Sequence, residues 1–346
     1  MKKLSVATNI VAGRFEASTS LVAAINTVDP AEDPALEYQT KSFLNMLNIS
    51  GGKPMEQMVP IEARAILTEA QSSVTVDVSG VEISRKTITE DGLTIPLTIV
   101  RPSGIEGVLP VFMFFHGGGW VIGDYPTHAR FIRDLVISSG ALAVYVDYTR
   151  SPEARYPVAL NECYAATKWV SENGNQINAD GKRLAVVGNS AGGNLAAAVA
   201  LMAKNKKEPE IKFQVLFWPV TDAFFETESY NMYATGRFLT KNMMKWFWNN
   251  YMPDSQDREQ IFVSPLKATL RELAGLPPTL VQTAENDVLR DEGEAYARKL
   301  NEAGVSVTLV RYLGMIHDYG LLNPLAHVSE VQSALRHAGN ELKNAL

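Results

Sequence analysis

The stretch Arg183–Ala203, which reads RLAVVGNSAGGNLAAAVALMA, contains the pattern that decides the fold. An apolar run ends at Gly188, Ser190 follows among small residues, and an alanine-rich run then predicts a helix. A G-x-S-x-G pattern between a buried strand and a helix indicates a nucleophile elbow, a strained turn that holds the serine oxygen clear of the sheet. The alternative is a serine that only caps the N-terminus of the helix.

Composition places the chain among ordinary globular proteins. Its 346 residues are 46% hydrophobic and 20% charged, which is enough apolar sequence for a large core. The formal net charge of −6 gives no electrostatic footprint for nucleic acid. The basic start has only a short apolar stretch, interrupted by Thr8 and Asn9, so we expect a cytoplasmic protein. No run of about eighteen apolar residues predicts a membrane span, and the single cysteine, Cys163, predicts a buried free thiol.

Around this stretch, strand and helix patterns alternate. Buried strands are predicted from apolar runs at 109–115, 141–149, 183–189, 212–220, 277–287 and 305–314, most of them separated by helical patterns. This rhythm predicts a mostly parallel sheet that is covered by helices on both faces. Residues 81–102 instead predict two antiparallel strands, with Asp91 and Gly92 as the hairpin turn.

Two segments do not follow this rhythm. Residues 1–75 show no strand pattern, and residues 224–262 are rich in methionine and aromatic side chains. We expect 1–75 to form an N-terminal helical cap segment and 76–346 to form the main α/β domain, with 224–262 contributing to the cap. Such a cap would pack over the carboxyl ends of the strands.

A serine hydroxyl needs a base and an acid that orients the base. His317 lies just after the last predicted strand, and Asp287 ends the strand before it. The rivals for the acid are Glu285, Asp291 and Asp318. The chain order of serine, aspartate and histidine is that of the α/β hydrolases rather than of the major serine proteases.

A glycine-rich loop supplies the third component. His116 begins the sequence HGGGW directly after the strand at 109–115. Three consecutive glycines are costly to order, but they let the backbone approach a ligand and present N–H groups to it. The pattern matches the oxyanion loop of lipases and esterases, so the amides of Gly118, Gly119 and Ala191 are the expected oxyanion donors, with Gly117 as a further candidate. We interpret His116 as a residue that fixes the loop.

With these motifs in place, residues 80–346 resemble the hormone-sensitive-lipase-like (family IV) carboxylesterases. The resemblance is densest at HGGGWVIGD, VDYTRSPEARYP, GNSAGGNLA and DVLRDEGEAYA. It implies an α/β-hydrolase fold with an eight-stranded sheet flanked by helices, a helical cap, and ester hydrolysis without a metal or cofactor. It carries the triad roles to Ser190, Asp287 and His317. Asn189 stands where many members have aspartate or threonine, Thr149-Arg150 replaces Arg-Leu, and HDYG replaces the more frequent His-Gly-Phe.

The expected substrate is a small-molecule ester with a short acyl chain. A capped pocket of limited volume would favour such chains, and the aromatic residues near the motif ends are its candidate lining: Trp120, Trp218, Phe224, Phe225 and Phe238. An amidase or arylformamidase is the alternative within enzymes, and a non-catalytic ligand-binding homologue is the alternative outside them. The resemblance also suggests a homodimer that pairs through the last strand, 305–313.

Overall fold

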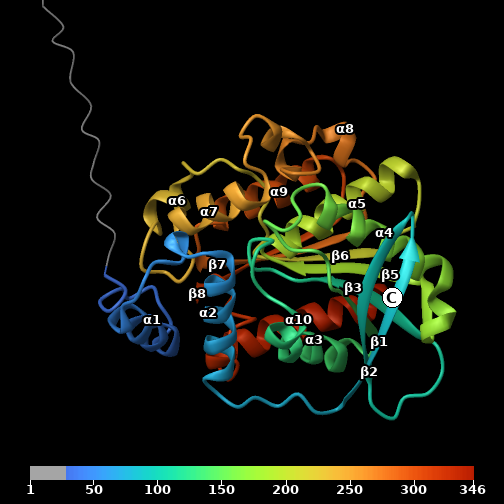
Figure 1. Cartoon of the computed structure of the whole chain (residues 1–346), viewed down its shortest axis with the longest axis horizontal. Coiled ribbons are helices and arrows are strands. Elements are labelled where there is room, and N and C mark those ends of the chain that lie inside the picture. The colour runs from blue at the N-terminus through green and yellow to red at the C-terminus, as the bar shows by residue number, and fades with distance from the viewer. Residues whose placement is uncertain (1–28) are drawn as a thin grey trace, which may run out of the picture.

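The computed structural model describes residues 29–346 and contains one eight-stranded sheet (Figure 1). The spatial order of the strands is β1-β2-β4-β3-β5-β6-β7-β8. The first pair and the β2–β4 pair are antiparallel, and all the others are parallel. The strands are β1 (Val81–Glu90), β2 (Leu93–Pro102), β3 (Leu109–Phe115), β4 (Leu142–Val146), β5 (Ala179–Asn189), β6 (Phe213–Phe217), β7 (Thr279–Asn286) and β8 (Val307–Ile316). The predicted mostly parallel sheet is therefore confirmed.

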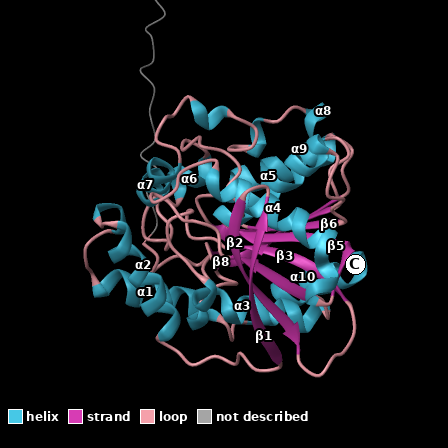
Figure 2. Cartoon of the chain, turned by 45° about the vertical axis from the view of Figure 1, so that its right-hand side comes forward, coloured by secondary structure: helices cyan, strands magenta, loops and turns pink. Residues whose placement is uncertain are grey.

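Helices cover both faces of the sheet (Figure 2). Helices α3 and α10 lie on one face, and α4, α5 and α9 lie on the other. The helices are α1 (Tyr38–Ser50), α2 (Pro60–Ser72), α3 (Tyr125–Ser139), α4 (Val158–Asn173), α5 (Ala191–Lys206), α6 (Glu228–Met232), α7 (Lys241–Tyr251), α8 (Leu270–Leu273), α9 (Arg290–Glu302) and α10 (Ser329–Ala345). Among residues 29–346, none of them is long and apolar enough to cross a membrane.

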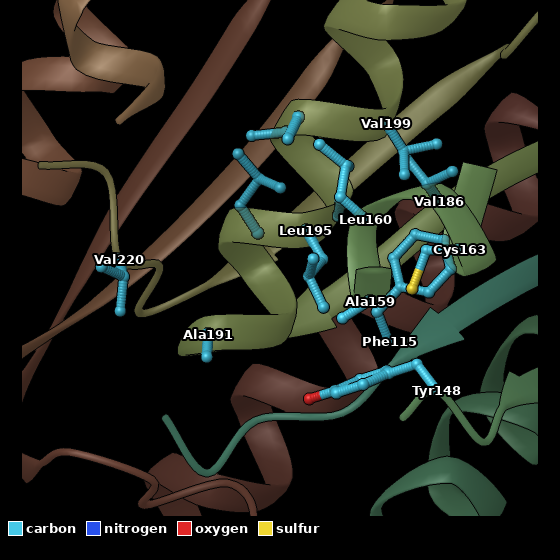
Figure 3. Close-up of a cluster of buried hydrophobic side chains, with 14 of the residues drawn as sticks. Phe115, Tyr148, Ala159, Leu160, Cys163, Val186, Ala191, Leu195, Val199 and Val220 are labelled. Atoms are coloured by element: carbon cyan, nitrogen blue, oxygen red, sulfur yellow. The ribbon is translucent and has the colours of Figure 1, made fainter. Parts of the chain in front are cut away.

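The buried strands have apolar side chains on both faces, so the sheet separates two hydrophobic cores. Along β3, Met113 and Phe115 point into the core beneath α4, α5 and α9, whereas Phe112 and Phe114 point into the core beneath α3 and α10. Figure 3 shows part of the first core, where Cys163 lies among side chains from the sheet and the helices. The predicted buried free thiol is confirmed.

The predicted hairpin is also confirmed. Strands β1 and β2 pair in register from Val81 to Glu90, and only two residues connect them. Asp91 and Gly92 both have positive φ, 48° and 78°, as a two-residue turn between right-twisted strands requires.

Helices α1, α2, α6 and α7 gather at one end of the molecule (Figure 1). Two chain segments that are far apart in sequence are joined there: Asn48 donates to the carbonyl of Gly236 across 3.3 Å, and Arg237 forms an ion pair with Asp33 at 2.5 Å. Of the cap segment predicted at 1–75, residues 1–28 lie outside the described residues. These four helices are called the cap below.

Candidate active site

Ser190 occupies a strained turn between β5 and α5. Its φ of 55° and ψ of −121° lie outside the ordinary regions for a residue with a side chain. The hydroxyl does not cap α5; instead Oγ lies 3.0 Å from Nε2 of His317. The helix-cap interpretation of this serine is therefore wrong, and the elbow interpretation agrees with the geometry.

The glycines around the serine are required by close backbone contacts. A Cβ at Gly188 would overlap the carbonyl of Gly192, and a Cβ at Gly192 would overlap the carbonyl of Phe115 on β3. The spacing of glycines in the motif thus lets the strand and the helix pass each other closely enough to expose the serine oxygen.

His317 lies between Ser190 and a buried carboxylate. Its Nδ1 is 2.7 Å from Oδ2 of Asp287, and the other carboxylate oxygen accepts the amide N–H of Leu289 at 3.0 Å. All three side chains of the predicted triad are brought together, and each is at most 4% exposed. They have the geometry of a Ser-His-Asp triad.

The rival carboxylates have other partners. Glu285 accepts the amide N–H of Gly314 at 2.8 Å, and Asp291 accepts a backbone N–H of α6 at 2.7 Å. Neither is bonded to His317. Asp318 is close to the imidazole but on its opposite side, where its Oδ2 is 3.9 Å from Nε2.

Two carboxylates set the pKa of His317. Burial alone would lower this pKa, because it disfavours the charged imidazolium. The negative charges of Asp287 and then Asp318, together with the hydrogen bond to Asp287, outweigh burial and raise the pKa above its ordinary value of 6.5. The site therefore stabilises the imidazolium that forms when the imidazole accepts a proton.

The loop after β3 presents two amides beside the serine. Gly118 and Gly119 line the same cavity as Ser190 and have positive φ, 102° and 57°. Within the described residues their N–H groups have no hydrogen-bond acceptor. Ala191 is the first residue of α5, so its amide also has no partner in the helix. The three predicted donors are thus available to an oxyanion.

Gly117 is not available in the same way. Its amide N–H donates to Oδ1 of Asn189 at 3.0 Å, so the suggestion that Gly117 is a further oxyanion donor is wrong. The physical reason is that Asn189, which precedes Ser190, accepts this N–H with its side-chain oxygen and so holds the glycine loop against the elbow.

A second hydrogen-bonded group connects the elbow to the histidine loop. Oδ1 of Asp318 accepts Nε1–H of Trp218 at 2.7 Å and Nδ2–H of Asn189 at 3.1 Å. Asp318 has a φ of 59°, a left-handed conformation that turns its carboxylate back toward the elbow. The sequence singled out Asn189 and the HDYG segment as departures from the family pattern, but it did not show that they are partners.

His116 fixes the glycine loop from below. Its Nδ1–H donates to the carbonyl of Gly117 at 2.8 Å, and its ring stacks on Tyr148 at 4.2 Å between centroids. Burial lowers the pKa of His116 well below the ordinary value, so the ring stays neutral. This geometry agrees with a structural role for His116.

The serine and the histidine open into a cavity of about 440 Å³. Its walls are largely apolar, and much of them comes from the cap helices and the segments beside them: Phe43, Met46, Leu47, Met55, Ile66, Leu67, Val74, Leu239, Met243 and Phe247. Of the five aromatic residues predicted to line the pocket, Phe238 does so. Among residues 29–346, no three His, Cys, Asp or Glu side chains gather closely enough to hold a metal ion.

The other four aromatic predictions are wrong. Trp120 is fully buried and stacks on Tyr251, and Trp218 is fully buried against the sheet with its N–H on Asp318. Phe224 is 55% exposed, and Phe225 packs edge-on against Tyr230. Proximity to a motif along the chain did not predict the direction in which these side chains point. The sequence also missed the lining from α1 and α2, for which it carries no signal beyond their apolar residues.

Comparisons with known proteins agree on one family. A family model described as the alpha/beta hydrolase fold matches residues 112–321. A thermostable esterase from Pseudomonas putida has a similar structure, with a TM-score of 0.90 and 63% identity over 91% of this chain and 98% of that chain. An esterase with the same identity and TM-score was solved as a serine-to-alanine variant in complex with (S)-Ac-CPA. Carboxylesterase NlhH of Mycobacterium tuberculosis is 38% identical over 240 residues, 68% of this chain and 75% of that protein.

Proposed function

We propose a specific activity for this chain. The chain belongs to the hormone-sensitive-lipase-like carboxylesterases of the α/β-hydrolase fold, and it is a carboxylic ester hydrolase. The proposal is that it hydrolyses esters of short-chain acids through an acyl-enzyme formed on Ser190. The observation that carries it is the alignment of Ser190, His317 and Asp287 at the floor of a capped apolar cavity. The serine-to-alanine variant solved with (S)-Ac-CPA supports a serine nucleophile in this group of enzymes.

In the first half of the reaction, His317 accepts the proton of Ser190 at Nε2 while Oγ attacks the ester carbonyl carbon. The amides of Gly118, Gly119 and Ala191 donate to the oxyanion, and Asp287 stabilises the imidazolium. The tetrahedral intermediate then collapses as the imidazolium gives its proton to the departing alcohol. In the second half, His317 takes a proton from water, the water oxygen attacks the acyl carbon, and the acid is released.

The cap supports the preference for short acyl chains. Phe238 and Phe247 line the cavity above the catalytic groups, and α1 and α2 supply much of the remaining wall. A cavity of about 440 Å³ is at the small end of ligand sites, so it holds a short acyl group together with a compact alcohol. A long acyl chain would extend beyond the apolar wall that surrounds Ser190.

The test is a series of 4-nitrophenyl esters of increasing acyl length. We expect kcat/KM to be highest for chains of about two to six carbons and to fall for longer ones. Ser190→Ala should lower kcat by about 10⁶-fold. Ser50→Ala, at an exposed serine at the end of α1, is the matched control and should behave as the wild type. A Ser190→Ala variant that keeps more than a tenth of the activity would contradict the proposed nucleophile, and a maximum at long chains would contradict the proposed substrate class.

Two alternatives are separated by direct measurements. An amidase or arylformamidase would use the same oxyanion donors and base, so rates on matched esters and anilides decide between them. A non-catalytic ligand-binding protein would not react with a fluorophosphonate probe. We expect faster turnover of the ester, and probe labelling that Ser190→Ala abolishes.

The edge strand β8 is the proposed dimer contact. It pairs with β7 on one side only. The carbonyl of Gly314 already accepts the amide N–H of Glu37 at 3.1 Å, so a second copy of the chain would pair with the part of the edge that precedes Gly314. Light scattering would give twice the monomer mass if this pairing occurs. Leu313→Pro, at a residue that is 65% exposed, should then reduce the mass to that of the monomer.

A further inference from the structure

Asp318 is a carboxylate in a cavity whose walls are largely apolar. It is 6% exposed and lines the cavity together with Ser190 and His317. Among the described residues that line this cavity, there is no lysine, arginine or glutamate. The negative charge of Asp318 therefore has no cationic side chain beside it in the cavity, apart from the imidazole of His317 when that ring is protonated.

Neighbouring side chains fix the position of this charge. Both Trp218 and Asn189 donate to Oδ1 of Asp318, at 2.7 and 3.1 Å, and both donors are fully buried. The second oxygen, Oδ2, is 3.9 Å from Nε2 of His317. This nitrogen is also within hydrogen-bond distance of the Ser190 hydroxyl. The carboxylate is consequently held close to the position of the reacting ester, and its second oxygen faces the catalytic side of the imidazole.

We propose that Asp318 determines the charge selectivity of the active site, disfavouring esters that carry an anionic group and favouring neutral or cationic ones. This inference rests on the proposed function, because it assumes that the ester binds in the cavity above Ser190. An anionic group in the cavity would meet a fixed negative charge in apolar surroundings, where charges interact more strongly than in water. A cationic group would gain from the same charge. Asp318 contributes to raising the pKa of His317, which agrees with a charge that acts on the reacting atoms.

The test compares three aryl acetates of similar size but different charge: 3-acetoxybenzoate, 3-acetoxybenzamide and (3-acetoxyphenyl)trimethylammonium. For each ester, kcat/KM is measured with the wild type and with Asp318→Asn, which keeps the size of the side chain and removes its charge. In the variant, we expect the ratio of the anionic to the neutral rate to rise by about tenfold or more, and the ratio of the cationic to the neutral rate to fall. Differences in leaving-group reactivity cancel, because each ester is compared with itself in the two proteins.

Two further variants separate charge from structure. Trp218→Phe removes a hydrogen bond to Asp318 but keeps the charge, so its anionic-to-neutral ratio should stay that of the wild type. Asp318→Gly also removes the charge, and glycine suits the φ of 59° at this position, so it replaces Asp318→Asn if that variant does not fold. Its anionic-to-neutral ratio should rise as well.

The outcomes distinguish the inference from the function on which it rests. If removal of the charge changes the three rates by the same factor, Asp318 has only a structural role and the inference is wrong. If Trp218→Phe raises the anionic ratio as much as Asp318→Asn does, charge is not the cause, and the inference is also wrong. If the wild-type protein hydrolyses none of the three esters, the proposed function fails and the inference fails with it.

Discussion

Asn189 and Asp318 are hydrogen-bonded to each other across 3.1 Å, although 129 positions separate them in the chain. One directly precedes Ser190 and the other directly follows His317. The carbonyl oxygen of the same Asn189 side chain accepts the amide of Gly117 at 3.0 Å. A single amide side chain thus joins the elbow, the histidine loop and the glycine loop, and the relative positions of the catalytic groups depend on it.

We expect an aspartate at position 189 to be harmful in this chain. Asn189→Asp would place a second carboxylate against Asp318 and remove the N–H donor between them. Two buried carboxylates in contact repel each other, and one hydrogen bond is lost, so the free energy of unfolding should fall by about 1–3 kcal/mol and kcat should decrease. Thermal unfolding and ester hydrolysis measure the two effects.

A double-mutant cycle shows whether this repulsion is the cause. In the background of Asp318→Asn, Asn189→Asp introduces a carboxylate that no longer faces a second one. Its cost in stability should therefore be smaller than in the wild type. Equal costs in the two backgrounds would mean that residues 189 and 318 are not coupled.

The raised pKa of His317 predicts the acidic limb of the pH profile. The free enzyme needs a neutral imidazole, so kcat/KM should fall as the pH drops through the pKa of His317, which is above the ordinary value of 6.5. The charged groups that raise this pKa are Asp287 and Asp318. Asp318→Asn removes one of them, so the limb should move to lower pH. A limb that does not move would show that Asp318 does not act on this titration.

Two buried histidines should make the fold sensitive to acid. Burial is the main cause that lowers the pKa of both His116 and His128. Between these lowered values and about 6.5, the unfolded chain binds more protons than the folded chain, so this part of the stability is present above about pH 6.5 and is lost as the pH falls below it. His116→Phe, which keeps a ring on Tyr148, should weaken the decrease in Tm between about pH 7 and pH 5.

A matched histidine variant isolates this effect from the other titrating groups. Glu292, for example, has a pKa that burial raises well above its usual range, and it contributes with the opposite sign. The comparison is therefore between the pH dependence of Tm for His116→Phe and for His327→Phe, at an exposed histidine. The same pH dependence in both variants would contradict a contribution from His116.

Gly119 should not tolerate a side chain. A Cβ there would overlap the ring of Phe247 in the cap, and the φ of 57° adds backbone strain. Gly119→Ala should displace the loop that carries the oxyanion donors and lower kcat by about 10²-fold. Gly140→Ala is the matched control, because Gly140 has a φ of 70° with no atom near its Cβ position. It should lose some stability and keep its activity.

The cause of the loss in Gly119→Ala is tested by removing the obstructing ring. If the overlap with Phe247 matters, Phe247→Ala should recover part of the activity in the double variant. No recovery would mean that strain at the positive φ alone displaces the loop.

The sequence predicted those features that depend on local pattern and chain order. The apolar runs gave the parallel strands, because a strand buried on both faces has few polar residues, and Asp91-Gly92 gave the hairpin. Ser190, Asp287 and His317 follow the carboxyl ends of β5, β7 and β8, and this chain order was enough to place them together. Each of these predictions depends on where the backbone runs, in a strand, in a tight turn or at the end of a strand, and not on how distant side chains pack.

Contacts between distant side chains were not predictable in this way. Trp120 ends the glycine loop and Trp218 follows β6, but both rings are fully buried in the core and do not line the cavity. The contribution of α1 and α2 to the cavity depends on how the cap packs, and no periodicity encodes that. Asp318 was considered only as a rival to Asp287, because adjacency to a histidine says nothing about which ring nitrogen a carboxylate faces.

The sulfur atoms in the cavity wall have a chemical consequence. Met46, Met55 and Met243 contribute unbranched thioethers, which change shape easily around different acyl groups. Met46 is 67% exposed, so a peroxide in solution reaches it without entering the site. Its oxidation to a sulfoxide would put a polar, branched group in an apolar wall. The range of esters that the protein accepts would then change with oxidant exposure, while every group that carries out the reaction remained intact.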